Sequence, residues 1–376
     1  MGLSHHRSVT FLILIVVAPM FAMCIAHAAV YINDPLLAEQ WGWYRIDADR
    51  AYESGVSGSG VIVAVLDSGV NSSHPDLSGK IIEGWNYVDN NDDVMDEDGH
   101  GTMVAGIIAA MANNSIGIAG VASNVSIMPL KVLSSSGGSW TDLDKAILKA
   151  AHSGARIITM SLGGEYSRPS MAIEAAINHA YQDGCLLVAA AGNDNNSEPF
   201  YPAACENVIA VAAIDQVSIK AAFSNYGEYI DFCAPRVNIL TTSKDGNYVY
   251  GSGTSFAAPF VTGVICLMVS QYPQLTNEQV ITTLRAEAED LGEMGWDQYY
   301  GWGLVNAYAA CSEIPIPEFS GSLPVLLILT LIVVLAGNLA LLLKVRINRQ
   351  GNITMQSLKE VNILNFPISI DLMPDS

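Results

Sequence analysis

Basic residues are scarce in this sequence. Its 376 residues include 17 Lys and Arg against 37 Asp and Glu, a formal net charge of −20. A nucleic-acid-binding protein needs a basic surface, so this class of partner is excluded. Charged residues make up only 14% of the chain and hydrophobic residues 51%, which excludes a disordered chain or a coiled coil. The mean hydropathy of +0.31 is high for so acidic a protein, and indicates that apolar and acidic residues occupy different parts of the chain.

The first stretch without acidic residues is the N-terminus. Residues 1–28 contain no Asp or Glu, start with His5-His6-Arg7, continue apolar from 9 to 26 and end in Ala26-His27-Ala28. A basic start, an apolar middle and an A-x-A end are typical of a secretory signal peptide. We predict cleavage after Ala28, with an uncleaved membrane anchor as the alternative.

The second stretch, residues 323–343, has no charge over 21 residues. At about 1.5 Å per residue, a helix of this length spans a hydrocarbon core of roughly 30 Å. Lys344, Arg346 and Arg349 follow directly, and basic residues beside a span remain in the cytoplasm. We therefore predict a juxtamembrane linker at 313–322, a transmembrane helix at 323–343 and a cytoplasmic tail at 344–376. The preceding 316–321 also resembles the sorting signals of some archaeal surface proteins, which is the alternative to a plain anchor.

The acidity belongs to the outward-facing segment between these two stretches. Residues 29–322 contain 34 acidic and 12 basic residues, a net charge of −22. Two interpretations stand side by side: a solubilising surface, and binding of cations such as calcium.

Cysteine provides no candidate site. Five cysteines remain once Cys24 is removed with the predicted signal peptide, and no CxxC or His/Cys pattern indicates zinc. An odd number leaves at least one thiol unpaired within the chain. Cys185, Cys233 and Cys266 lie in apolar runs, so we expect them in the core.

Apolar runs alternate with helical patterns along the outer segment. Strands are expected at 61–66, 126–133, 157–161, 186–191 and 208–213, and helices at 102–112, 141–153 and 169–183. This alternation predicts an α/β fold of three layers, with a mostly parallel central sheet and helices on both faces. Ligands of such sheets bind at the carboxyl ends of the strands. Because no repeat or linker interrupts the pattern, we predict one domain at 29–312.

Three short segments at predicted strand or helix ends carry an Asp, a His and a Ser. They are Asp67-Ser68-Gly69, the segment 98–102 around His100, and the Gly-rich segment 251–259 around Ser255. A serine hydroxyl becomes a strong nucleophile when a histidine takes its proton and a carboxylate orients that histidine. Each segment alone is weak, since such a serine is more often a helix cap and such a histidine a surface residue. The three segments together, in the order Asp, His, Ser and with their neighbouring residues, indicate a catalytic centre for acyl transfer.

The flanking residues resemble the subtilisin family (subtilases) of serine endopeptidases, and within it the thermitase-like branch. The similarity covers nearly all of residues 33–308, with matching motifs at 63–70, 100–106, 189–193 and 253–259. The resemblance implies a subtilisin-like fold in which Ser255 attacks the scissile carbonyl, with His100 as base and then acid. It further implies that Asp67 orients His100, and that the Asn193 amide and the Ser255 backbone N–H hold the oxyanion.

The same resemblance implies where peptide or protein substrates bind. An extended substrate strand would lie between two backbone edges, Gly137-Gly138-Ser139 and Ser161-Leu162-Gly163. Main-chain pairing tolerates many side chains, so we expect broad specificity with an apolar preference in the main pocket. An ordinary flexible loop is the alternative for 137–139. Met103, Arg236 and Phe256 depart from the usual family residues, which affects the expected fine specificity and not the reaction.

Calcium is the cofactor that the resemblance implies, in a structural role. A tight site would use the side chains of Asp34, Asp76 and Asn114 and the carbonyls of Ala112, Ile116 and Ile118. A second site would lie in the acidic loop 86–98, with Asp89, Asn91 and Asp93 as ligands and Asn86 and Met95 at the remaining positions. A solvated acidic loop is the alternative for this second site.

Together these patterns predict a calcium-stabilised serine endopeptidase anchored in the cell membrane, with its peptidase domain extracellular. The residues between Ala28 and Asp67 already resemble the mature N-terminus of the family, so we expect no pro-domain. Two alternatives remain: a dedicated processing protease with a narrow substrate range, and a non-catalytic surface module that retains the fold. The four matched motifs argue against the second, because a binding module needs no complete catalytic set.

Overall fold

The fold is centred on a seven-stranded sheet with the strand order β11-β10-β8-β6-β1-β3-β2. A computed structural model describes residues 32–165 and 169–312, and every neighbouring pair in this sheet is parallel. The strands are β1 (Ile62–Asp67), β2 (Trp85–Asn86), β3 (Ser126–Lys131), β6 (Ile157–Met160), β8 (Leu186–Ala190), β10 (Val208–Ile214) and β11 (Phe232–Pro235). All five expected strands are present, and β2 and β11 are additional.

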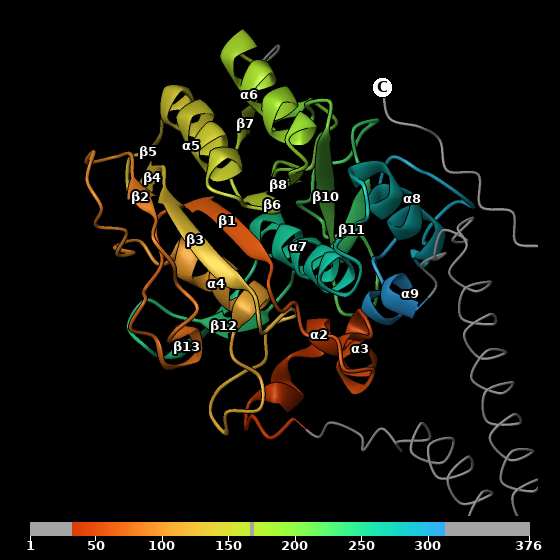
Figure 1. The fold of residues 1–376 in the computed structure, drawn as a ribbon. Helices are drawn as coiled ribbons and strands as arrows, with labels where there is room; N and C mark the ends of the chain where they lie inside the picture. The colour runs from red at the N-terminus through yellow and green to blue at the C-terminus, as the bar shows by residue number, and fades with distance from the viewer. Residues whose placement is uncertain (1–31, 166–168, 313–376) are drawn as a thin grey trace, which may run out of the picture. The chain divides into compact units, whose positions relative to one another are not determined.

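Helices cover both faces of this sheet (Figure 1). The long helices are α4 (His100–Ala109), α5 (Trp140–His152), α6 (Met171–Gln182), α7 (Thr254–Gln271) and α8 (Asn277–Glu287). Successive residues of a strand point to opposite faces. Val63 and Val65 of β1 accordingly pack in the core that contains α4 and α7, whereas Ala64 and Leu66 pack in the core that contains α5 and α6. The predicted three-layer α/β fold is therefore confirmed.

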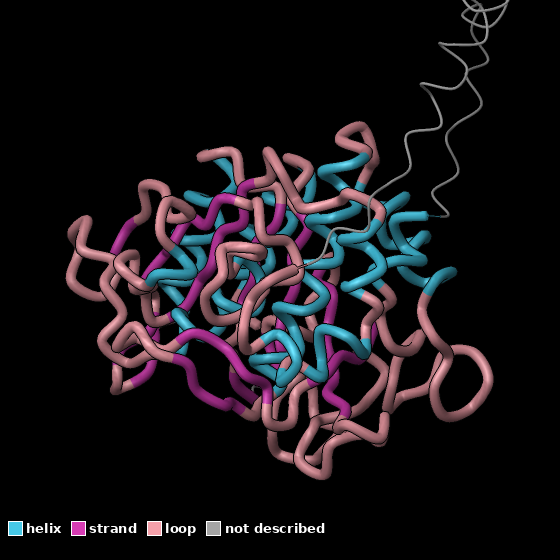
Figure 2. The backbone as a smooth tube through the Cα atoms, turned by 90° about the horizontal axis from the view of Figure 1, so that it is seen from below, coloured by secondary structure: helices cyan, strands magenta, loops and turns pink. Residues whose placement is uncertain are grey.

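Short elements connect and border these layers. The short helices are η1 (Leu37–Glu39), α2 (Trp41–Arg45), α3 (Ala48–Glu53), η2 (Pro75–Leu77) and α9 (Ala307–Ser312). Three antiparallel pairs are formed by β4 (Leu133–Ser134) with β5 (Gly137–Gly138), β7 (Gly164–Glu165) with β9 (Phe200–Tyr201), and β12 (Ile239–Thr242) with β13 (Tyr248–Gly251). The connecting loops lie mostly at the periphery (Figure 2).

Helix α7 is the one helix in the described part of the chain that is long and apolar enough to cross a membrane. It lies in the protein core, with 83% of its apolar window buried. A helix surrounded by other elements is apolar on all sides for that reason. The predicted signal peptide at 1–28 and the predicted span at 323–343 lie outside the described residues.

The five cysteines of the described residues are all buried and unpaired. Cys185, Cys233 and Cys266 are at most 1% exposed, which confirms their predicted place in the core. The odd number of cysteines predicts at least one unpaired thiol, and all five thiols of the described residues are unpaired.

Candidate active site

Three elements bring the predicted catalytic side chains to one place. Asp67 is the last residue of β1, His100 the first of α4, and Ser255 lies in the first turn of α7. Nδ1 of His100 lies 2.8 Å from Oδ1 of Asp67. The Asp67 side chain is 1% exposed and the His100 side chain 27% exposed, so the imidazole joins a buried carboxylate to the surface.

Gly101 allows α4 to start this close to the end of β1. A Cβ atom at Gly101 would lie 2.1 Å from the carbonyl oxygen of Gly69, closer than real atoms approach. Any larger residue would therefore push His100 away from Asp67. This close approach gives a physical reason for the glycine that follows the histidine in the motif.

The Asp67 carboxylate is held at one oxygen only. Its Oδ1 accepts the hydrogen bond from His100 and a second one from the Ser68 backbone N–H at 2.7 Å. Its Oδ2 is buried and has no hydrogen-bond partner among the described residues. The carboxylate is thus little screened by solvent or donors, and its charge acts strongly on the imidazole.

Ser255 and Ser161 hold each other through two hydrogen bonds. The Ser255 hydroxyl donates to the Ser161 carbonyl oxygen at 3.1 Å, and the Ser161 hydroxyl donates to the Ser255 carbonyl oxygen at 2.8 Å. That carbonyl is free for Ser161 because Pro259, four residues on in α7, has no N–H to donate. Within the described residues the Ser255 hydroxyl makes no hydrogen bond to His100, and such contacts often tighten only when substrate binds.

Asn193 lies beside the same turn, in the loop after β8. Its side-chain oxygen accepts hydrogen bonds from the Thr254 backbone N–H at 2.9 Å and from the Thr254 hydroxyl at 3.1 Å. The Gly192 N–H in turn donates to the Thr254 hydroxyl at 3.2 Å. These bonds fix the oxygen of the exposed Asn193 side chain on Thr254, the first residue of α7.

A cleft of about 390 Å³ opens beside His100. It is lined by all six predicted substrate-binding residues, Gly137, Gly138, Ser139, Ser161, Leu162 and Gly163. Apolar side chains form part of the wall, among them Val132, Leu133 and Leu143. The two segments named from the sequence, separated by more than 20 residues, therefore face one cleft.

Comparison with known proteins decides the family. The family model described as "Subtilase family" matches residues 58–303. The chain belongs to the subtilase family. It is 43% identical over 282 residues to thermitase from Thermoactinomyces vulgaris, covering 74% of this chain and 98% of the relative. It is 42% identical over 271 residues to subtilisin Savinase from Lederbergia lenta, covering 72% and 97%.

A solved structure supports the same assignment. The proteases from Pseudoalteromonas arctica PAMC 21717 align with a TM-score of 0.71 at 32% identity, covering 76% of this chain and 99% of theirs. The fold is therefore subtilisin-like, and this subtilase is a serine endopeptidase.

The predicted tight calcium ligands of this subtilase lie together. The buried Asp34 carboxylate accepts hydrogen bonds from the backbone N–H groups of residues 113–115, and Asn114 donates through its amide to the buried Asp76 at 2.8 Å. No Lys or Arg forms an ion pair with either carboxylate in the described residues. Burial raises the pKa of Asp34, backbone hydrogen bonds oppose this, and the Asp76 charge raises it further. Two buried carboxylates without a counter-charge suit a cation. The other three predicted ligands, Ala112, Ile116 and Ile118, lie in the same loop after α4 as Asn114.

The second predicted calcium loop is folded on its own polar groups. The Asn86 amide donates to Asp89 Oδ2 at 3.0 Å and to the Asp93 carbonyl at 2.8 Å, and the Asp93 N–H donates to Asn91 Oδ1 at 3.0 Å. The Met95 carbonyl accepts from the Lys131 ammonium at 3.1 Å. Asp89, Asn91 and Asp93 are exposed. These contacts fit the alternative of a solvated acidic loop as well as they fit an ion site.

Sequence reasoning missed the organising role of Asp96. This acid is 4% exposed and accepts five hydrogen bonds, from Ser68 Oγ, the backbone N–H groups of residues 98, 99 and 102, and the Thr102 hydroxyl. It therefore caps the start of α4 and ties it to the residue after Asp67. Asp96 lies four residues before His100, which is the one feature of the sequence that indicates this role. Five other acidic residues in the same loop make it impossible to single out Asp96 from the sequence.

The raised pKa of His100 predicts an alkaline pH dependence. Burial tends to lower this pKa, but the charge and hydrogen bond of Asp67 and the charges of Asp98 and Asp96 outweigh it and raise the pKa to about 9. His100 must be neutral to accept a proton. The rise of kcat/KM with pH should therefore have its midpoint near pH 9, rather than near the ordinary histidine pKa of 6.5. Asp98→Asn should move this midpoint toward lower pH, because the Asp98 charge is one of the causes that raise the pKa of His100. A kcat/KM profile with an uncharged peptide tests this, and a limb at 6.5 in both proteins would contradict it.

Arg236, the residue directly after β11, is buried. It is 3% exposed, its Nε and Nη1 have no hydrogen-bond partner in the described residues, and its guanidinium carbon lies 3.0 Å from the Phe223 ring centroid. Burial lowers its pKa to about 9. A buried cation held only by an aromatic ring costs free energy of folding.

Arg236→Met keeps an unbranched side chain on Phe223 and removes the charge. We expect it to raise the free energy of unfolding by about 1–3 kcal/mol, measured by urea denaturation of inhibitor-blocked enzyme. Arg50→Met is the matched control, because Arg50 also lies over an aromatic ring, Tyr308, but at the surface. A loss of stability in Arg236→Met larger than in the control would refute the prediction.

Proposed function

We propose that this subtilase cleaves peptide bonds through an acyl-enzyme on Ser255, with His100 as proton carrier and Asp67 as its orienting carboxylate. The observation that carries the proposal is the 2.8 Å contact between His100 and Asp67 beside a cleft lined by all six predicted substrate-binding residues. The cleft and the contact supply the two requirements of peptide hydrolysis, a place for an extended chain and a base at its edge.

The reaction starts with attack of Ser255 Oγ on the scissile carbonyl carbon while His100 Nε2 takes the hydroxyl proton. The hydroxyl must turn from the Ser161 carbonyl to His100 for this step. The tetrahedral intermediate places a negative oxygen near the Asn193 NH2 group and the Ser255 backbone N–H, and the positive end of α7 favours the same charge. As the intermediate collapses, the C–N bond breaks, protonated His100 gives its proton to the leaving amine, and the acyl group stays on Ser255 as an ester. Water then attacks the acyl carbon while His100 takes a proton from it. The bond to Ser255 Oγ breaks as His100 returns a proton to the serine, and the carboxylic acid product leaves.

Substrate recognition rests on backbone pairing. Segments 137–139 and 161–163 both line the cleft, and main-chain pairing of a substrate with such segments depends little on its side chains. We infer broad specificity, with an apolar preference from Val132, Leu133 and Leu143. A peptide-library cleavage profile tests this: cleavage at one narrow motif would favour the dedicated processing protease instead.

Catalysis itself is tested with a serine-directed covalent inhibitor. Casein or peptide hydrolysis should stop when the inhibitor reacts, and mass spectrometry should find the label on Ser255. The absence of hydrolysis together with the absence of labelling would favour a non-catalytic module that retains the fold.

We further propose that Asp34, Asp76 and Asn114, with carbonyls of Ala112, Ile116 and Ile118, hold a structural calcium ion. Calcium prefers such oxygen ligands and would offset the charge of the two buried carboxylates. The ion would tie the N-terminal segment at Asp34 to the loop after α4 and stabilise the fold by mass action.

A chelator should therefore lower the melting temperature. A ligand at a thousand times its Kd stabilises by about 4 kcal/mol, and each kcal/mol shifts Tm by about 2–4 °C in a domain of this size. We expect a fall of roughly 10 °C on calcium removal, measured by calorimetry on inhibitor-blocked enzyme. Asp34→Asn should have a low melting temperature that the chelator does not change. Asp89→Asn should lose as much melting temperature in chelator as the parent does. An unchanged Tm in millimolar chelator would refute the tight site.

We also propose secretion by way of residues 1–28 and anchoring through 323–343, with the peptidase domain outside the cell membrane. The uncharged length of 323–343 and the basic residues after it support this topology. N- and C-terminal sequencing of the protein extracted from membranes is the test. A mature protein that ends before residue 323 would favour removal of the span by a sorting enzyme.

A further inference from the structure

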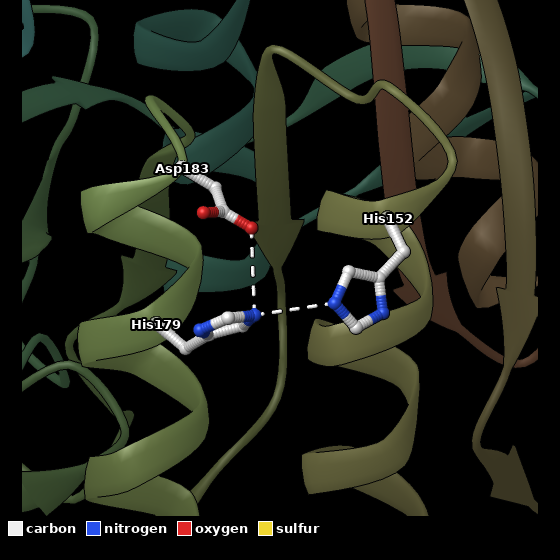
Figure 3. A group of neighbouring side chains, drawn as sticks. All are labelled: His152, His179 and Asp183. Atoms are coloured by element: carbon white, nitrogen blue, oxygen red, sulfur yellow. Dashed lines mark hydrogen bonds and ion pairs between the residues drawn. The ribbon is translucent and has the colours of Figure 1, made fainter.

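A group of metal-ligating side chains lies away from the cleft, at the ends of α5 and α6. His152 is the last residue of α5, His179 lies in the last turn of α6, and Asp183 follows that helix directly (Figure 3). His152 Nε2 lies 3.1 Å from His179 Nε2, which lies 3.4 Å from Asp183 Oδ2. The three ligand atoms all lie within 4.8 Å of one another.

We propose that His152, His179 and Asp183 bind one borderline divalent cation, with Zn²⁺ as the representative ion, and that it joins the ends of α5 and α6. Zinc binds imidazole nitrogen and carboxylate oxygen at about 2.0–2.2 Å in tetrahedral geometry. Two ligand atoms on one such ion are therefore roughly 3.3 Å apart. The separations of His179 Nε2 from His152 Nε2 and from Asp183 Oδ2, 3.1 and 3.4 Å, match this spacing, and the ligand atoms of His152 and Asp183 lie within 4.8 Å of each other.

The electrostatics of the location favour a cation. Both helices end here, and the carboxyl end of a helix carries a partial negative charge. Asp183 adds a full negative charge, and the outer segment as a whole has a net charge of −22. Nε2 of His152 and Nε2 of His179 face each other at 3.1 Å, so a single metal ion can use the lone pairs of both nitrogens.

The ligands are preorganised because their helices are fixed against the sheet. Leu143 and Ile147 of α5 and Ile173 and Ile177 of α6 belong to the same buried core. Helices held in this way need little rearrangement to bind an ion. All three ligand residues are exposed, so the ion can enter from solvent and keep water in its fourth position.

The site lies at the opposite end of α5 from the substrate cleft. Ser139 and Trp140 line the cleft at the start of this helix, and His152 ends it 13 residues later. At 1.5 Å per residue this places the metal site roughly 20 Å along the helix from the cleft. The ion would thus fasten two helices of one layer and take no part in peptide hydrolysis.

The test is titration of the full chain with Zn²⁺ in calcium-containing buffer, by isothermal calorimetry and thermal melting, in a Ser255→Ala background that prevents self-digestion. We expect one zinc ion with a micromolar Kd and a higher Tm. His179→Ala and His152→Ala should each weaken this binding at least tenfold, with an unchanged Tm in the absence of zinc.

Two matched controls separate this site from others. Glu174→Gln removes an exposed acid from α6, and His5→Gln with His6→Gln removes the two consecutive histidines of the sequence, which the titrated full chain still contains because its residues 1–28 are uncleaved. Both should retain zinc binding. The proposal is overturned if the parent binds no zinc below 100 µM, an order-of-magnitude limit of about 5 kcal/mol, if His179→Ala binds zinc like the parent, or if binding disappears in the His5/His6 variant.

Discussion

Replacement of Ser255 by alanine is expected to lower kcat by about 10⁶-fold, the loss measured when the serine is removed from a triad of this chain order. A methyl group cannot attack the scissile carbonyl, and the Ser161 carbonyl and water offer no substitute nucleophile of comparable reactivity. The side chain of Ser255 is half-buried and, among the residues that the structure describes, makes one hydrogen bond, to Ser161, so the fold should be kept. Steady-state kinetics on a chromogenic peptide, with melting temperature as a check on folding, measure the effect.

Ser252→Ala is the matched control for this prediction. Ser252 lies three residues earlier, is exposed, and accepts a hydrogen bond from the Asn238 N–H at 3.0 Å. Its loss should leave kcat within a few fold of the parent. Residual activity above about 1% in purified Ser255→Ala, a reduction of only about 2.7 kcal/mol in transition-state stabilisation, would show that Ser255 is not the nucleophile.

The parallel sheet could be predicted because its strands are buried on both faces. Val61 to Leu66 reads as an uninterrupted apolar run, and β1 is found at 62–67. Strands β2 and β11 gave no such signal, since they have two and four residues and β11 ends in Pro235. The strand expected to continue to residue 133 ends at 131 instead, because Leu133 pairs with Gly138 to form the antiparallel β4–β5 edge.

The grouping of Asp67, His100 and Ser255 could also be predicted, because Asp67 ends a strand and His100 and Ser255 lie in the first turns of helices. Features that depend on packing between distant elements could not. Arg236 acquires its environment from Phe223, and His152 meets His179 only because α5 and α6 pack side by side in one layer. The spacing of residues along the chain does not predict which helices pack against each other.

Replacement of Asp67 by asparagine should lower kcat about 10⁴-fold at neutral pH with little effect on substrate affinity. Oδ1 of Asp67 accepts from both Ser68 N–H and His100 Nδ1. If the asparagine keeps its oxygen there, the imidazole loses the charge that stabilises its protonated form. If the amide turns round, its NH2 group faces the Ser68 N–H, and His100 must accept at Nδ1. In that tautomer Nε2 carries the proton and cannot take another from Ser255.

Two further measurements identify this loss as an effect on His100. The pKa of His100 should fall, because Asp67 is the main group that raises it, so the residual activity of Asp67→Asn should follow a limb well below 9. Asp98→Asn, which removes a nearby charge but no contact with the ring, should keep most of its activity on the alkaline side. If Asp67→Asn stayed within tenfold of the parent, a difference of only about 1.4 kcal/mol, the buried carboxylate would not be the group that orients the base.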